Sequence, residues 1–106
     1  MKIYVKDTAK SADDYYVMKE CRSDILLQVN DVFYHLNFMT TFLLNQEVSC
    51  DDFYYIKNLF PVENVSIENI TKIIKRNVEH KYYEDLLPEK NVSISEWIQV
   101  YPEKQN

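Results

Sequence analysis

The residues best suited to forming a binding surface are tyrosines that stand beside pairs of acids, and this arrangement occurs three times. The three stretches are DDYY at 13–16, DDFYY at 51–55 and YYED at 82–85. Tyrosine offers a large contact area and is enriched at protein interfaces, while acids steer a basic partner. Some clustering also follows from the composition, because the chain has 9 Tyr and 17 Asp and Glu.

Helical phase separates the members of the second and third clusters into outward and inward side chains. We expect Phe53, Tyr55 and Tyr82 in the core or at its margin, since they continue apolar stripes. The remaining side chains should face solvent and form a partner-binding site. They are Asp52, Tyr54, Tyr83, Glu84 and Asp85.

Residue types that bind metals or act as nucleophiles are few and widely spaced. The candidates are Cys21, Cys50, His35 and His80. None forms a close pair of the C-x-x-C or H-x-x-x-H kind, which zinc sites usually use. Adjacent acids point apart in a helix or strand, so the acid pairs are not catalytic dyads. We therefore expect no metal, no cofactor and no catalytic residues; a small enzyme whose Cys and His meet only in space is an alternative.

The composition excludes other functions. The chain has no glycine, which rules out a glycine-rich phosphate loop and a dinucleotide-binding fingerprint. Its formal charge of −5 is spread over both halves, so an acidic surface should repel nucleic acid and attract a basic protein. The sequence lacks a membrane-spanning apolar run and a signal peptide, which predicts a cytoplasmic protein without membrane contact.

The strongest local pattern is a β-hairpin at about 24–44, within a single domain of residues 1–106. A two-residue turn at Asn30-Asp31 would place six apolar side chains on one face, because both strands alternate in the same register. They are Ile25, Leu27, Val29, Val32, Tyr34 and Leu36. The second strand should continue past its partner, with Phe38 and Phe42 facing the core and the overhang pairing with another strand.

The remaining elements predict an α+β fold with an antiparallel sheet. Alternation indicates short strands at 2–6 and 97–101, although Ser93 and Glu96 could instead cap a short helix. Residues 7–23 look like a loop. A short helix at about 51–60 and a long helix at about 66–87, capped by Ser66 and closed by Pro88, should pack on the sheet.

This layout resembles the immunity proteins of bacterial polymorphic-toxin and contact-dependent growth inhibition systems. The resemblance covers residues 1–87 and lies in the hairpin DILLQVNDVFYHLNFMTT, the short helix after it, and the long helix SIENITKIIKRNVE. It implies a protein that binds a cognate toxin domain, often a basic nuclease, and occludes its active site.

Our first hypothesis is therefore a non-enzymatic antitoxin with a basic toxin protein as its partner. The proposed acids would replace substrate phosphates at the toxin's basic site, and tyrosines would anchor in its groove. The alternative is a phage-encoded acidic nucleic-acid mimic or anti-defence protein. A toxin gene beside this gene would favour the first hypothesis, and phage structural genes the second.

Overall fold

The computed structural model describes residues 1–6 and 12–103. The predicted hairpin lies at the centre of the fold. The register is the expected one, with Val29 opposite Val32 and the inner pairs following in step. Five of the six predicted core side chains are buried, and only Val32, beside the turn, is 41% exposed. Asn30 adopts a positive φ of 56°, a conformation that Asn tolerates better than most residues.

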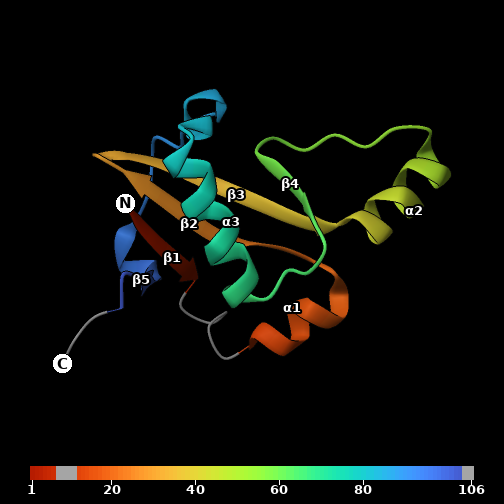
Figure 1. The fold of residues 1–106 in the computed structure, drawn as a ribbon, viewed down its shortest axis with the longest axis horizontal. Helices are drawn as coiled ribbons and strands as arrows, with labels where there is room; N and C mark the ends of the chain where they lie inside the picture. Colours follow the sequence, from red (N-terminus) through yellow and green to blue (C-terminus); the bar gives the residue numbers. More distant parts are fainter. Residues whose placement is uncertain (7–11, 104–106) are drawn as a thin grey trace.

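The hairpin lies in the middle of a five-stranded sheet (Figure 1) with strand order β4-β3-β2-β1-β5. The two short terminal strands are confirmed: β1 pairs antiparallel with β2 on one side and with β5 on the other. The strands are β1 (Lys2–Lys6), β2 (Cys21–Val29), β3 (Val32–Thr40), β4 (Leu59–Val62) and β5 (Trp97–Tyr101).

The predicted α+β class is confirmed, but the sheet is mixed instead of antiparallel throughout, because β4 runs parallel to β3. Residues 41–58 form a crossover connection that contains a helix, and such a connection lets the chain return in the same direction. The predicted overhang of the second strand was wrong, because β2 begins at Cys21 and pairs with β3 as far as Met39. The same end of β3, from Asn37 to Thr40, pairs with β4 along its other edge.

The helices differ more from the predictions. They are α1 (Asp13–Lys19), α2 (Thr41–Asp51) and α3 (Ile67–Glu79), followed by the 3-10 helices η2 (Tyr82–Asp85) and η3 (Ile94–Glu96). The loop predicted over 7–23 contains α1 and the start of β2, while 7–11 lie outside the described residues. The alternative for 93–96 holds in part, because the short η3 turn directly precedes β5.

The short helix lies ten residues earlier than predicted. Thr40 ends β3 and caps α2, its side chain accepting a hydrogen bond from the Leu43 backbone N–H at 3.2 Å. The helix ends where Asp52 adopts a left-handed conformation. Phe42 therefore lies on an exposed helix instead of facing the core. The apolar residues of α2 are distributed around its axis, so helical periodicity could not reveal it.

The long helix begins as predicted, since the Ser66 side chain accepts a hydrogen bond from the Asn69 N–H at 3.2 Å. It ends at Glu79 instead of continuing to about residue 87. Lys81 adopts a positive φ of 61° and redirects the chain into η2 before Pro88 is reached. The apolar stripe of α3 ends at Val78, and the next core contacts, Tyr83 and Leu86, are made by η2 and the residue after it.

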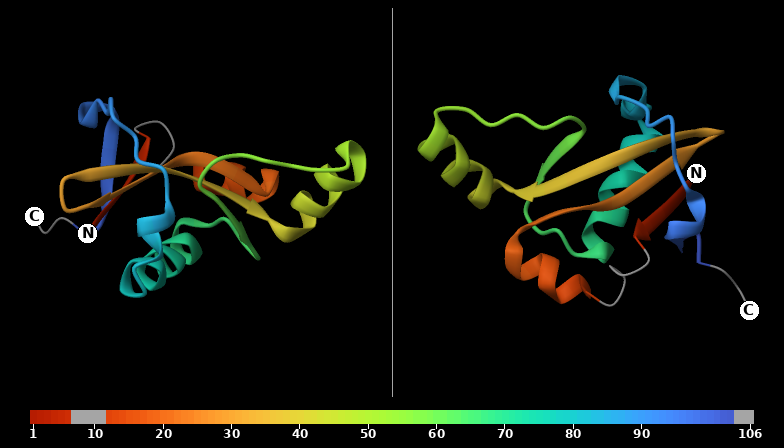
Figure 2. Two further views of the ribbon diagram at one scale, coloured as in Figure 1. Left: turned by 90° about the horizontal axis from the view of Figure 1, so that it is seen from above. Right: turned by 180° about the vertical axis from the view of Figure 1, so that it is seen from behind.

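One face of the sheet carries the core, and α3 covers it (Figure 2). The stripe packs as predicted, with Ile70 and Ile74 almost fully buried. The chain then wraps past β3, where the Glu89 N–H donates to the Phe33 carbonyl at 2.8 Å, and continues to β5. In the described part of the chain, no helix has the length and apolar character required to cross a membrane.

Candidate functional site

The most unusual feature of the surface is α2, which stands away from the sheet and from α3 at one end of the molecule (Figures 1 and 2). None of its residues is buried. The chain after it, residues 52–56, returns toward β4. We call residues 41–56 the arm.

The arm exposes large aromatic side chains. Phe42 is 61% exposed, Phe53 72% and Tyr55 78%. Large exposed aromatic side chains are a feature of protein interaction sites. The arm therefore has the composition of an interface.

An isolated helix the length of α2 is marginal in water, because most helical stability in proteins comes from packing an apolar face. Within the molecule α2 has its Thr40 cap and a hydrogen bond from the Ser49 hydroxyl to the Asn45 carbonyl at 2.8 Å. These local contacts stabilise α2 much less than a buried apolar face would. A partner that covers the arm would bury its apolar side chains and stabilise the helix.

The charge of the arm is entirely negative. Its acids are Glu47, Asp51 and Asp52, and residues 41–56 include no Lys or Arg. The next residue, Lys57, is paired with Glu89 at 3.3 Å. Complementary charge speeds encounter and selects partners, so the arm suits a basic surface.

A shallow hollow of about 480 Å³ lies along α2. Its lining combines the Phe42 ring with polar side chains that include Asn45 and Glu47. A hollow that offers one aromatic ring beside hydrogen-bonding groups can receive a side chain from a partner.

The base of the arm is held in place by Asn58, which adopts a positive φ of 52°. Its side-chain amide donates to the carbonyls of His35 at 3.0 Å and Leu87 at 2.9 Å, and its side-chain oxygen accepts from the Leu87 N–H at 2.9 Å. Asn37 adds a side-chain hydrogen bond to the Lys57 carbonyl at 2.9 Å. The arm thus projects from a fixed point of the sheet.

The predicted partner-binding residues do not come together. Asp52 and Tyr54 lie on the arm, whereas η2, with Tyr83, Glu84 and Asp85, lies beyond the end of α3 (Figure 1). Asp52, Glu84 and Asp85 are exposed as expected, and Tyr54 is only half-exposed.

Helical phase assigned several aromatic rings to the wrong side. Phe53 and Tyr55 were expected near the core but are the most exposed rings of the arm, because no helix forms at 53–56. Tyr82 was expected inside and is 59% exposed. Tyr83 was expected outside and packs edge-on against Tyr34, with ring centroids 6.2 Å apart. Because the chain turns at Lys81, Tyr82 faces solvent and Tyr83 faces the core, the reverse of the prediction.

Of the four soft metal-ligand candidates, Cys21 and His35 line the same pocket, whereas Cys50 and His80 do not line it. Cys21 is half-buried at the start of β2, Cys50 is exposed on α2, and both are free thiols. His35 packs edge-on against Trp97, and His80 stacks on Tyr82. Within residues 1–6 and 12–103, no three His, Cys, Asp or Glu side chains are grouped so that they could hold a metal ion.

Neither a protein-family model, nor a curated protein, nor a solved structure matches this chain.

Proposed function

We propose that this protein is a non-enzymatic inhibitor that binds a basic protein partner through its arm. The observation that carries the proposal is an exposed helix and its return segment with three exposed aromatic rings, three acids and no Lys or Arg. Aromatic rings anchor interfaces and acids accelerate the approach of a basic partner.

The resemblance to immunity proteins suggests which partner this is. The partner would be a cognate bacterial toxin domain in the cytoplasm, a nuclease whose substrate site is basic because it binds phosphates. Asp51 and Asp52 would occupy the positions of substrate phosphates, while Phe53 and Tyr55 would fill neighbouring grooves. Inhibition would then be occlusion, without any chemical step by this protein.

The decisive experiment is co-expression with the toxin domain encoded by the adjacent gene, followed by measurement of complex formation and toxin activity. We expect a stable complex and loss of toxin activity at equimolar ratio. Failure to bind that domain, together with capture of a nucleic-acid-binding defence protein, would favour the mimic hypothesis instead.

A pair of variants tests the arm itself. Replacing Phe53 and Tyr55 by Ser should raise the Kd about 30-fold or more, because an anchor residue contributes about 2 kcal/mol or more. Met18→Ser is the matched control, since Met18 is an apolar side chain on α1 that is 84% exposed. If the arm variant and the control bind alike, the interface lies elsewhere.

A further inference from the structure

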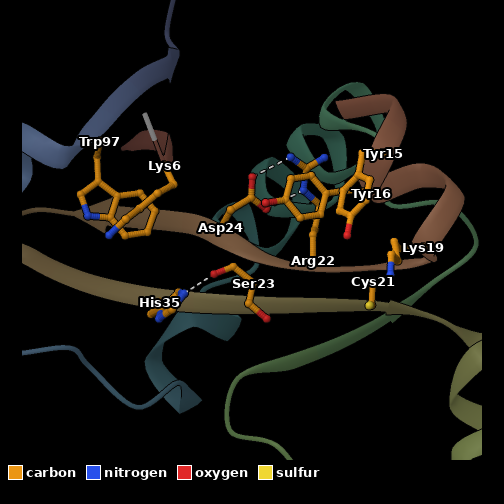
Figure 3. Close-up of a pocket in the computed structure, with 10 residues that line it drawn as sticks. All are labelled: Lys6, Tyr15, Tyr16, Lys19, Cys21, Arg22, Ser23, Asp24, His35 and Trp97. Atoms are coloured by element: carbon orange, nitrogen blue, oxygen red, sulfur yellow. Dashed lines mark hydrogen bonds and ion pairs between the residues drawn. The ribbon is translucent and has the colours of Figure 1, made fainter. Parts of the chain in front are cut away.

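A second site lies at the other end of the hairpin from its turn, in an open cleft of about 500 Å³ between α1 and β5 (Figure 3). Its volume falls within the range of small-molecule sites. The side chains that matter here come from both ends of the described chain and from the hairpin. They are Lys6, Tyr15, Tyr16, Lys19, His35 and Trp97.

The cleft has two lysine–aromatic pairs on opposite sides. Lys6 Nζ lies 4.9 Å from the centroid of the Trp97 ring, and Lys19 Nζ lies 5.4 Å from the centroid of the Tyr15 ring. Figure 3 shows the Lys6–Trp97 pair at one end and the Lys19–Tyr15 pair at the other. Each ammonium group lies over an aromatic ring, so each end of the cleft combines a flat apolar surface with a positive charge.

The rings are held in defined orientations. Tyr15 meets Tyr16 edge-on with centroids 5.6 Å apart, and His35 meets Trp97 edge-on at 5.9 Å. The His35 Nε2 atom donates a hydrogen bond to the Ser23 carbonyl, which can only accept. A ligand would therefore meet aromatic walls that are already positioned, which lowers the entropic cost of binding.

Arg22 forms the floor of the cleft, but its charge is not free for a ligand. It makes two hydrogen bonds to Asp24 and one to Asp13. Burial lowers the pKa of Arg22, yet the contacts with Asp24 and Asp13 outweigh it, so the pKa is raised overall and the group stays a cation. The two carboxylates more than balance its single positive charge, so these three groups together carry −1.

The positive groups of the cleft that a ligand can reach are its two lysines, of which Lys6 is paired with a glutamate. Lys6 shares its charge with Glu96 at 3.2 Å, where both side chains are largely exposed. In the described ranges, Lys19 has no carboxylate oxygen within 4 Å of its Nζ atom. In a protein with a net charge of −5, this cleft offers an anion two ammonium groups beside aromatic rings.

We propose that the cleft binds a small planar aromatic anion, an aromatic ring that carries a phosphate or a carboxylate. The ring would stack on the aromatic side chain at one end of the cleft, and its acidic group would contact the lysine at the other end, Lys19 or Lys6. This proposal is independent of the arm, since the cleft and the arm share no lining residue.

Trp97 gives the experiment a direct readout, because it is the only tryptophan in the chain. Its fluorescence should change in a saturable manner when phenyl phosphate or benzoate is added to the purified protein. Phenol, which has the ring without the charge, and inorganic phosphate, which has the charge without the ring, should each bind more weakly than phenyl phosphate. Comparing phenyl phosphate with benzoate shows which acidic group the lysines prefer.

Charge-removing variants locate the site. Lys19→Gln should weaken phenyl phosphate about fivefold, the upper range for an exposed ion pair, without changing the thermal midpoint. Lys57→Gln is the matched control for Lys6→Gln, because each lysine is half-exposed and paired with a glutamate at nearly the same distance. Only the Lys6 variant should weaken binding.

Three results would overturn the proposal. They are the absence of any saturable fluorescence change with phenyl phosphate, equal binding of phenyl phosphate and inorganic phosphate, and equal weakening by the Lys57 control. Chemical shifts of backbone amides on α1 and β5 provide a second measurement, and they should move with phenyl phosphate if the ligand occupies the cleft.

Discussion

The Arg22 guanidinium lies against the Asp24 carboxylate two residues further along β2, with the Nε–Oδ1 and Nη2–Oδ2 distances both 2.8 Å. A bulge between Arg22 and Ile25 places both groups inside the protein, where the Arg22 side chain is fully buried and the Asp24 side chain is 6% exposed. Arg22 also donates to the Val65 carbonyl at 3.0 Å and to Asp13. It thereby joins α1, β2 and the chain before α3.

Arg22→Met should lower the free energy of unfolding by about 3–5 kcal/mol, because it leaves buried Asp24 without its counter-ion. Chemical denaturation measures this value. The double variant Arg22→Met/Asp24→Leu should recover much of the loss, since it removes both buried charges. A loss below about 1 kcal/mol in the single variant would show that water replaces the guanidinium.

Leu27→Ala should cost about 2–5 kcal/mol of stability, because Leu27 is fully buried on the core face of the hairpin. Val32→Ala, on the same hairpin but at a side chain that is 41% exposed, should cost well under half as much. Urea unfolding of both variants checks the register, and equal losses would contradict it.

Lys81→Gly should stabilise the protein by up to about 1 kcal/mol. The left-handed conformation at Lys81 costs a non-glycine residue about 1–2 kcal/mol, and glycine would remove this cost. The greater conformational freedom of glycine in the unfolded chain offsets only part of that stabilisation. Lys72→Gly, an exposed position inside α3, should instead lose about 1 kcal/mol. Thermal unfolding should therefore shift in opposite directions for the two variants.

Stability should fall at alkaline pH as tyrosines ionise. Burial raises the pKa of Tyr4 and of Tyr16, and for Tyr16 the Asp24 charge adds to the rise while Arg22 opposes it. Because these pKa values are raised in the folded state, each neutral tyrosine makes its full contribution to the free energy of unfolding below the unfolded pKa of about 10. That contribution is lost as pH rises through the folded pKa.

Tyr4→Phe tests this dependence, because it removes a hydroxyl that donates to Gln28 Oε1 at 2.8 Å. The slope of unfolding free energy against pH above about 10 should become shallower than in the natural protein. Tyr55→Phe removes a hydroxyl from a ring that is 78% exposed and serves as the control. An unchanged slope in the Tyr4 variant would contradict the prediction.

The arm should govern the rate at which the basic partner associates. Neutralising Glu47, Asp51 and Asp52 together should lower kon and flatten its dependence on salt, because exposed charges act over about 8 Å at physiological ionic strength. Neutralising Glu84 and Asp85 of η2 in the same way shows which of the two predicted clusters binds the partner. A larger effect at η2 than at the arm would move the interface to the end of α3. Surface plasmon resonance at several salt concentrations measures both.

Much of the fold was predictable because local patterns on the sheet are strict. Side chains alternate with a period of two, so the apolar residues of 25–29 and 32–36 permit one register. Ser66 marks the start of α3 because its hydroxyl caps the first turn. These features depend on neighbours in sequence.

Tertiary contacts decided the rest. The apolar residues of α2 do not line one face of the helix, so no pattern predicts it. The residues at 53–60, whose spacing predicts a helix, instead form an exposed segment and the start of the parallel edge strand β4, because Leu59–Val62 pair with the free edge of β3. The bulge that turns Arg22 inward has no sequence signal of its own; it is stabilised by acids at Asp13 and Asp24, which come from α1 and β2. The cleft exists only where α1 meets β5, since Tyr15 and Trp97 are far apart in sequence and are brought together by the pairing of β1 with its two neighbours.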